Sequence, residues 1–374
     1  MNTSTLTTED AVAAAVADAQ GPIVIRGGGT RSVGRPVVGE VLDVSGLSGI
    51  TLYEPGALTI VAQAGTPIAE IEATLATENQ RLAFEPYDLT GLLGTRGAST
   101  IGGVIATNAS GPRRIAAGAA RDFALGVRFV DGSGQVIKNG GRVMKNVTGY
   151  DLVKLMCGSW GTLGVLTEVS LKVLPAVEAV RTLRLEGLGA SNAVAAMGAA
   201  LGSPFDVSGA AWIDGAVWLR VEGFDASVSY RATKLAELLG SHADVETVDD
   251  ADWAQVRDAK PLHTQETVWR VSVKPSHAPS VISALPDGCE TLLDWGGGLI
   301  WIGINTGDAV SVHATVQDTV GVLGGHATLI KGSDTLRAAV PVFQPESAGV
   351  AALSAALRQR FDPNGILNPG LMAA

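Results

Sequence analysis

The sequence predicts an α+β protein with two domains and a C-terminal segment. Three observations lead to this prediction. The chain has 374 residues, more than the ~100–200 of a usual domain. Short strand-like runs alternate with amphipathic helical runs, and the composition changes near Pro175. We place a first domain at residues 1–175, a second at 176–340, and the C-terminal segment at 341–374.

The first domain begins with a predicted helix over residues 9–20, because Thr7 or Thr8 can cap it and Gly21 follows its end. A buried strand over 22–25 then runs into three glycines. Apolar residues at spacings of three and four predict a helix over 68–79. Asp131-Gly132-Ser133-Gly134 predicts a hairpin turn. The remaining predicted elements of this domain are strands at 41–44, 58–62, 124–130, 135–138 and 165–173, and a helix at 151–156.

The second domain is predicted to be antiparallel α+β. Six of the seven tryptophans lie beyond residue 200, mostly in or beside short strand-like runs such as 216–222, 268–273 and 299–304. A helical run over 227–239 lies between the strand-like runs 216–222 and 268–273. We expect the tryptophans to be core residues rather than a substrate cage. In the C-terminal segment, a helix over 347–360 carries Val350, Leu353 and Leu357 on one face.

Charge and cysteine content exclude several classes of protein. The chain has 27 basic and 37 acidic residues, a formal charge of −10, and no basic cluster of the kind that binds nucleic acid. Two cysteines cannot by themselves ligate an iron–sulfur cluster. Glu9, Asp10 and Asp18 interrupt any apolar leader. We therefore expect a cytoplasmic protein, one that can dock at the cytoplasmic face of a membrane only through partners.

The first segment that could bind a ligand is Gly27-Gly28-Gly29, directly after a predicted strand. Consecutive glycines can turn successive N–H groups into one concavity that binds phosphate, although a simple tight turn fits as well. The segment is not the dinucleotide fingerprint of a doubly wound fold, whose last glycine opens a helix. Here Val33-Gly34-Arg35-Pro36 follows, which is a poor helix start.

Two further segments are candidates for a ligand site. Residues 99–114 carry small side chains, hydroxyls and an amide, and end in Arg113-Arg114. Close, flat backbone with donors at its edge suits an extended aromatic ligand, and a close-packed buried turn fits equally. Residues 145–152 and 158–168 form the third segment. In the second segment, the pair Arg113-Arg114 can hold a substrate carboxylate or a cofactor phosphate, or remain a solvated pair.

In this order and spacing, the three segments resemble the FAD-binding domain of the p-cresol methylhydroxylase/vanillyl-alcohol oxidase (PCMH) type, over residues 22–175. The ending at residues 361–370 resembles that family's C-terminus. Residues 111–114 and 143–151 resemble most the FAD-binding subunits of bacterial glycolate oxidases. The resemblance implies a two-subdomain flavin domain at 1–175, a substrate or cap domain at 176–340, and a C-terminal segment that returns to the flavin domain.

The resemblance also implies which residues hold FAD. The glycine loop would bind the pyrophosphate, and the second and third segments would line the flavin. The cofactor-binding residues expected on this basis are Arg26, Gly27, Gly28, Gly29, Thr30, Thr100, Ile101, Gly102, Gly103, Thr107, Asn108, Ser110, Gly111, Gly164 and Val165.

The sequence departs from other family members in its histidines. Some members attach FAD through a histidine beside the glycine loop, but no histidine occurs here before His242, so we expect noncovalent FAD. Cys157 could form a thioether, but a buried helix cysteine is the favoured interpretation. Larger 2-hydroxy-acid dehydrogenases carry a histidine-rich segment for metal and substrate. Here the five histidines are isolated, and we expect no metal site.

No catalytic base stands out. Tyr150 and Lys145 are the candidates, with a core tyrosine and a salt-bridged lysine as the competing interpretation. The function implied is FAD-dependent oxidation of glycolate, a 2-hydroxy acid, to glyoxylate. Electrons would leave through partners, a larger FAD-linked subunit and an iron–sulfur subunit. Two alternatives remain open: a self-sufficient FAD dehydrogenase for another 2-hydroxy acid or alcohol, and a noncatalytic assembly or electron-relay subunit.

Overall fold

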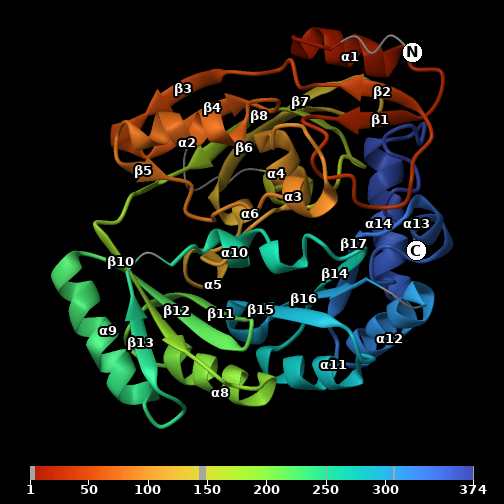
Figure 1. Ribbon diagram of the computed structural model, residues 1–374. Coiled ribbons are helices and arrows are strands. Elements are labelled where there is room, and N and C mark those ends of the chain that lie inside the picture. The colour runs from red at the N-terminus through yellow and green to blue at the C-terminus, as the bar shows by residue number, and fades with distance from the viewer. Residues whose placement is uncertain (1–4, 143–148, 250, 306–307, 374) are drawn as a thin grey trace. The chain divides into compact units, whose positions relative to one another are not determined.

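The computed structural model describes residues 5–142, 149–249, 251–305 and 308–373. Within these ranges the chain forms two compact units (Figure 1). Unit 1 contains Met1–Ser110, Gly118–Ala176 and Pro345–Ala374. Unit 2 contains Gly111–Ala117 and Val177–Gln344. The chain therefore leaves unit 1 for seven residues, returns to it, and comes back a second time at its C-terminal end.

Unit 1 is built on a five-stranded antiparallel sheet in the order β3-β4-β8-β6-β7. A parallel pair, β1-β2, and a short antiparallel pair, β5-β9, complete its strands. The strands are β1 (Ile23–Arg26), β2 (Glu40–Asp43), β3 (Ile50–Glu54), β4 (Thr59–Gln63), β5 (Gln80–Arg81), β6 (Ala124–Val130), β7 (Val136–Gly140), β8 (Val165–Lys172) and β9 (Leu174–Pro175). The helices are α1 (Glu9–Ala17), α2 (Ile68–Ala76), α3 (Thr90–Leu93), α4 (Ile101–Thr107), α6 (Ala120–Phe123), α7 (Leu152–Met156) and α14 (Ala348–Phe361), with the 3-10 turn η1 (Pro55–Ala57).

Local sequence signals explain several of these elements. The Thr8 side chain caps α1 by accepting from the Ala11 N–H. Ile68, Ile71 and Leu75 form the buried face of α2, as their spacing predicts. The Asp131 carboxylate accepts N–H bonds from Ser133 and Gln135 and so closes the turn between β6 and β7. The predicted hairpin is therefore confirmed.

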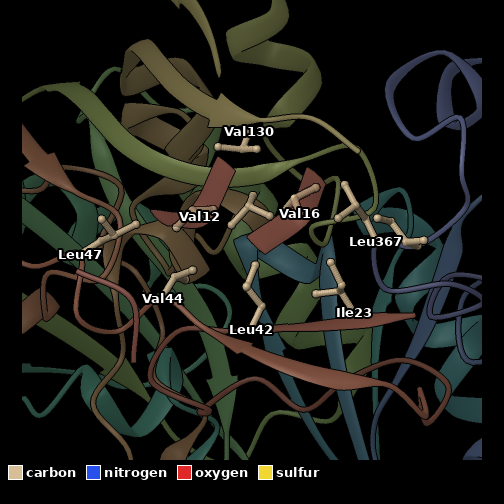
Figure 2. Close-up of a cluster of buried hydrophobic side chains, with 10 residues drawn as sticks. Val12, Val16, Ile23, Leu42, Val44, Leu47, Val130 and Leu367 are labelled. Carbon is tan, nitrogen blue, oxygen red and sulfur yellow. The ribbon is translucent and has the colours of Figure 1, made fainter. Parts of the chain in front are cut away.

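The core beside the N-terminal helix joins both ends of the chain (Figure 2). Val12 and Val16 of α1 pack against side chains from β1, β2, β6 and the C-terminal segment. The Ile23 N–H donates to the Ile366 carbonyl at 2.7 Å, and the Asn368 N–H returns a bond to the Ile23 carbonyl at 2.9 Å. The C-terminal segment thus forms backbone hydrogen bonds to β1, the strand that precedes the glycine loop. The buried members of this cluster are Val12, Val16, Ile23, Leu42, Val44, Leu47, Val130, Val165, Ile366 and Leu367.

Unit 2 is an antiparallel eight-stranded sheet in the order β13-β10-β12-β11-β15-β16-β14-β17. Helices α8, α9, α11 and α12 lie along one face (Figure 1). Its strands are β10 (Ala179–Leu185), β11 (Val207–Ile213), β12 (Ala216–Gly223), β13 (Val245–Val248), β14 (Thr267–Ser272), β15 (Glu290–Asp294), β16 (Leu299–Ile304) and β17 (His326–Lys331). Its helices are α5 (Arg114–Ala117), α8 (Ala190–Leu201), α9 (Asp225–Leu239), α10 (Ala254–Arg257), α11 (Ala278–Ala284), α12 (Ala309–Val322) and α13 (Asp334–Ala339), with 3-10 turns η2 (Lys260–Leu262), η3 (Pro275–His277) and η4 (Trp295–Gly297).

Apolar side chains are buried in unit 2 but exposed on α14. Trp269 and Trp301 are fully buried in unit 2, as expected of core residues. The stripe on α14 behaves differently, because Val350, Leu353 and Leu357 remain 49%, 68% and 40% exposed. No side chain of α14 is buried. Among the described residues, no helix is long and apolar enough to cross a bilayer.

Candidate functional site

The glycine loop and the second segment touch through their backbones. A Cβ atom on Gly28 would stand 1.6 Å from the Ala98 carbonyl oxygen, and one on Gly97 would stand 1.6 Å from the Gly28 carbonyl oxygen. A Cβ on Gly27 would meet the Thr100 hydroxyl oxygen at 2.7 Å. Only glycine allows this approach. The structure thus brings together two segments that the sequence separates by about seventy residues.

The loop after β1 keeps its backbone donors uncommitted. Among the described residues, none accepts a hydrogen bond from the N–H groups of Gly27, Gly28, Gly29 or Thr30. Gly29 takes a positive φ of 67°, as a turn that exposes successive N–H groups requires. Arg26, the last residue of β1, forms a 3.4 Å ion pair with Asp43 while its side chain stays 43% exposed. These features fit a loop that receives a phosphate group.

Arg31 connects the same two segments and is not among the residues expected to hold FAD. Its guanidinium donates to the Ser99 hydroxyl at 2.8 Å and to the Tyr87 carbonyl at 2.9 Å. Its Nε is buried without a partner among the described residues. Burial lowers the pKa of this guanidinium, and Tyr87 and Asp88 only partly offset the effect. A buried cation of this kind gains from a nearby anion. The sequence feature that could have identified Arg31 is its position directly after the glycine loop.

Helix α4 and its two capping residues, Thr100 and Asn108, include most of the residues expected to line the flavin. Thr100 caps the helix and accepts from the Gly103 N–H. The Ile101 and Gly102 N–H groups donate to the carbonyls of Thr66 and Ala64. Gly102 is held tightly, because a Cβ there would lie 2.7 Å from the Ala64 Cβ. Gly103 has space, since a Cβ would meet only Thr100 Oγ1 at 3.4 Å and Arg31 Nη1 at 3.7 Å.

The third segment packs on the C-terminal end of α4. The Gly158 and Trp160 N–H groups donate to the carbonyls of Ile105 and Ala106. Asn108 ends the helix in the left-handed conformation, and its side chain accepts from the Arg121 N–H. Asn368 ties this region to β1, accepting from the Ile25 N–H and donating to the Trp160 carbonyl, both at 2.9 Å. The three segments and the chain's ending therefore meet in unit 1.

The remaining predicted site residues lie in different surroundings. Thr107 and Ser110 direct their hydroxyls to the carbonyls of Gly103 and Asn108. Gly164 has no room for a Cβ, which would stand 2.6 Å from the Phe129 ring, and Val165 is fully buried at the start of β8. Gly111 belongs to unit 2 rather than to unit 1.

The candidate catalytic residues gain little support. Tyr150 is 87% exposed, so it is not a core tyrosine. Lys145 lies outside the described residues. Cys157 is buried, and burial raises the pKa of its thiol to about 12, which keeps it protonated and unreactive at neutral pH. The described part of the chain contains no group of three potential metal ligands.

Comparisons with known proteins agree with this architecture. Residues 4–140 match the family model described as FAD binding domain. An alkyldihydroxyacetonephosphate synthase structure superposes with a TM-score of 0.71 at 18% identity, over 96% of this chain and 73% of that one. The fold and the family match define a protein with a PCMH-type FAD-binding domain.

Sequence relatives narrow this class. The chain is 40% identical to "Glycolate oxidase subunit GlcE" of Escherichia coli (strain K12), over 94% of this chain and 93% of the relative. It therefore belongs to the family of FAD-binding subunits of bacterial glycolate oxidase. "Glycolate oxidase subunit GlcD" of Bacillus subtilis (strain 168) is 36% identical over 43% of this chain and 34% of that protein. A "D-lactate dehydrogenase" of Archaeoglobus fulgidus is 34% identical over 44% of this chain and 36% of that protein.

Proposed function

We propose that this chain is the smaller FAD-binding subunit of a glycolate oxidase complex that converts glycolate to glyoxylate. The observation that carries this proposal is the match to the Escherichia coli subunit over almost the whole of both chains. Other relatives named as hydroxy-acid oxidoreductases share only about a third of their own length with it. The match thus includes unit 2, not only the widespread flavin-binding unit.

We propose that unit 1 binds one FAD without a covalent bond. Gly27, Gly28 and Gly29 offer backbone N–H groups to the pyrophosphate, and the Arg31 guanidinium adds the positive charge. Residues of α4 and the start of β8 line the flavin. When bound, FAD would supply the two-electron acceptor that oxidation of the hydroxy acid requires. The protein holds the cofactor and substrate and must also receive the hydroxyl proton.

We further propose that electrons leave through partners, a larger FAD-linked subunit and an iron–sulfur subunit. Cys157 and Cys289 are the chain's two cysteines, and a cluster needs four such ligands. The cysteine count therefore favours a cluster that is held by another subunit. Partner subunits also fit the printed description of the Escherichia coli relative as a subunit.

Anaerobic rapid mixing tests the proposal. The FAD-loaded chain, alone and co-purified with the two proposed partners, is mixed with glycolate or D-lactate while flavin absorbance is followed. We expect slow, incomplete bleaching by the isolated chain and fast bleaching of the complex by glycolate. Fast, complete bleaching of the isolated chain would identify a self-sufficient dehydrogenase. A complex that contains this chain but shows the same rate without its FAD would identify a noncatalytic subunit.

A further inference from the structure

Asn368, in the C-terminal segment, lies where three parts of unit 1 meet. The residue is only 4% exposed. Its side-chain oxygen accepts from the Ile25 N–H and its side-chain nitrogen donates to the Trp160 carbonyl, both at 2.9 Å. Its own N–H donates to the Ile23 carbonyl. Both ends of the Asn368 amide are therefore committed to backbone groups that lie 343 and 208 positions earlier in the chain.

The turn at Trp160 is held in an unusual conformation. Trp160 and Gly161 have positive φ values of 53° and 71°, and a bulky residue in this region is strained unless its surroundings hold it there. The Trp160 N–H donates at 2.9 Å to the carbonyl of Ala106, near the C-terminal end of α4. A Cβ on Gly161 would stand 2.8 Å from Asn368 Nδ2 and 3.2 Å from Ile25 Cδ1. Helix α4 and Asn368 therefore hold the Trp160 turn from its two sides.

These contacts close a ring around the proposed FAD site within unit 1. Strand β1 leads from Ile25 into the glycine loop, whose backbone lies against residues 98–100 at the N-terminal end of α4. The C-terminal end of α4 is bonded to the Trp160 turn, and Asn368 joins that turn back to β1. The glycine loop and α4 are thus connected at both ends of the helix. The side chain that closes the ring belongs to the C-terminal segment.

We propose that Asn368 is a positioning residue for FAD, whose amide keeps the glycine loop and α4 in the relative position that binds the cofactor. The inference rests on the FAD site of the proposed function and not on its substrate. Loss of either hydrogen bond leaves a part-buried backbone group of Ile25 or Trp160 without this partner, which favours displacement of the chain. Because coupling between two binding events is reciprocal, bound FAD must in turn strengthen the docking of the C-terminal segment on β1.

Titration of FAD into the full chain, followed by flavin fluorescence, gives the dissociation constant. Asn368→Asp keeps the acceptor for the Ile25 N–H but turns an oxygen toward the Trp160 carbonyl. Asn368→Gly tolerates the positive φ of 43° at this position and removes both hydrogen bonds. We expect each variant to raise the dissociation constant by about tenfold or more. At saturating FAD, the visible absorption band of the flavin in Asn368→Asp should be shifted from that of wild type, because the cofactor is displaced.

Two matched variants separate positioning from stability. Asn364→Asp makes the same change at an exposed position in the same segment and should bind FAD like wild type. Leu75→Ala opens a cavity behind the buried face of α2. It should lower the urea midpoint and keep the wild-type dissociation constant and flavin spectrum. Loss of FAD in Asn368→Asp, at a urea midpoint no lower than that of Leu75→Ala, would support the positioning role.

Hydrogen exchange of the wild-type chain tests the reciprocal effect without any substitution. Saturating FAD should slow exchange in residues 362–371 by about tenfold or more and leave α9 of unit 2 unchanged. FAD affinity within twofold of wild type in both Asn368 variants, or unchanged exchange in residues 362–371, would overturn the inference. FAD binding that depends on Asn368, in a complex that does not oxidise glycolate, would sink only the proposed function.

Discussion

The Gly28 backbone and the Ala98 carbonyl lie so close that a single added Cβ would stand 1.6 Å from the carbonyl oxygen. This contact joins the glycine loop after β1 to the chain that enters α4. Neither segment alone identifies a cofactor site, since each also fits a tight turn. Their backbone contact, with the Arg31 side chain bridging them, places uncommitted N–H groups and a buried cation side by side.

Substitutions at Gly103 should separate cofactor binding from folding. Gly103→Ala has room for its Cβ, and alanine in a helix is favoured over glycine by ~0.5–1 kcal/mol. Gly103→Asp also places a carboxylate beside Arg31. We expect both variants to fold and to lose FAD, the aspartate variant more completely. Flavin absorbance per chain and far-ultraviolet circular dichroism measure the two properties.

Two glycine-to-alanine substitutions at other positions serve as comparisons. Gly349→Ala lies on exposed α14, where a Cβ meets nothing within 4 Å, and should keep full FAD content. Gly28→Ala must push the two segments apart, so it should lose FAD and also fold stability, by ~1–3 kcal/mol. Full flavin content in both Gly103 variants would show that α4 does not line the flavin.

FAD should be released intact when the protein is denatured. No histidine precedes His242, and the Cys157 thiol, with its pKa raised by burial to about 12, is a poor nucleophile at neutral pH. After acid precipitation and filtration, we expect about one FAD per chain in the filtrate. Yellow colour that stays with the polypeptide would contradict noncovalent binding, and Cys157→Ser would then identify or exclude the attachment point.

Breaking the Arg113–Glu222 pair should destabilise unit 2. Glu222→Gln removes the negative charge that compensates half-buried Arg113, and Arg220 Nε lies 3.9 Å from the same carboxylate. Removing one partner of a fully buried pair costs about 3–5 kcal/mol, and this half-buried pair should lose somewhat less. Urea unfolding should show this loss. Glu54→Gln provides the contrast, since its pair with Arg142 is 49% and 56% exposed and is worth about 0–1 kcal/mol. Equal effects of the two variants would refute the structural role of the pair.

Acid should weaken the fold through His313. This side chain is buried and accepts from the Trp269 indole N–H at 3.1 Å. Burial lowers its pKa below the ordinary value of 6.5, and a backbone hydrogen bond at Pro341 only partly opposes this. The unfolded chain therefore binds the proton more readily, and the free energy of unfolding falls as pH drops below 6.5. Urea midpoints between pH 7.5 and 5.5 measure the slope.

The variant His313→Gln keeps an acceptor for Trp269 but has no titrating ring. We expect a smaller loss of stability on acidification than in wild type. A residual slope is expected from His326, whose pKa is also lowered. An unchanged slope in His313→Gln would show that this histidine does not titrate with unfolding.

Much of the fold was predictable because its signals are local. Caps, apolar spacing and turn residues determine α1, α2 and the hairpin β6–β7 within a few residues of chain. The strand β3 was missed, because its alternation of half-buried and exposed residues is weak. The order and spacing of three glycine-rich segments identified the FAD-binding family, since that order is a property of the sequence itself.

Only the tertiary structure determines which residues Arg113 and Arg114 contact. The two residues are identical and adjacent, so composition and spacing treat them alike. Arg113 pairs with the Glu222 carboxylate, 109 positions away, and this pair is half-buried. Arg114 meets Trp295 and, through that ring, Arg270. The sequence by itself determined the family and the local elements. Which arginine pairs with a carboxylate and which stacks on an indole depends on partners that only the folded sheet brings close.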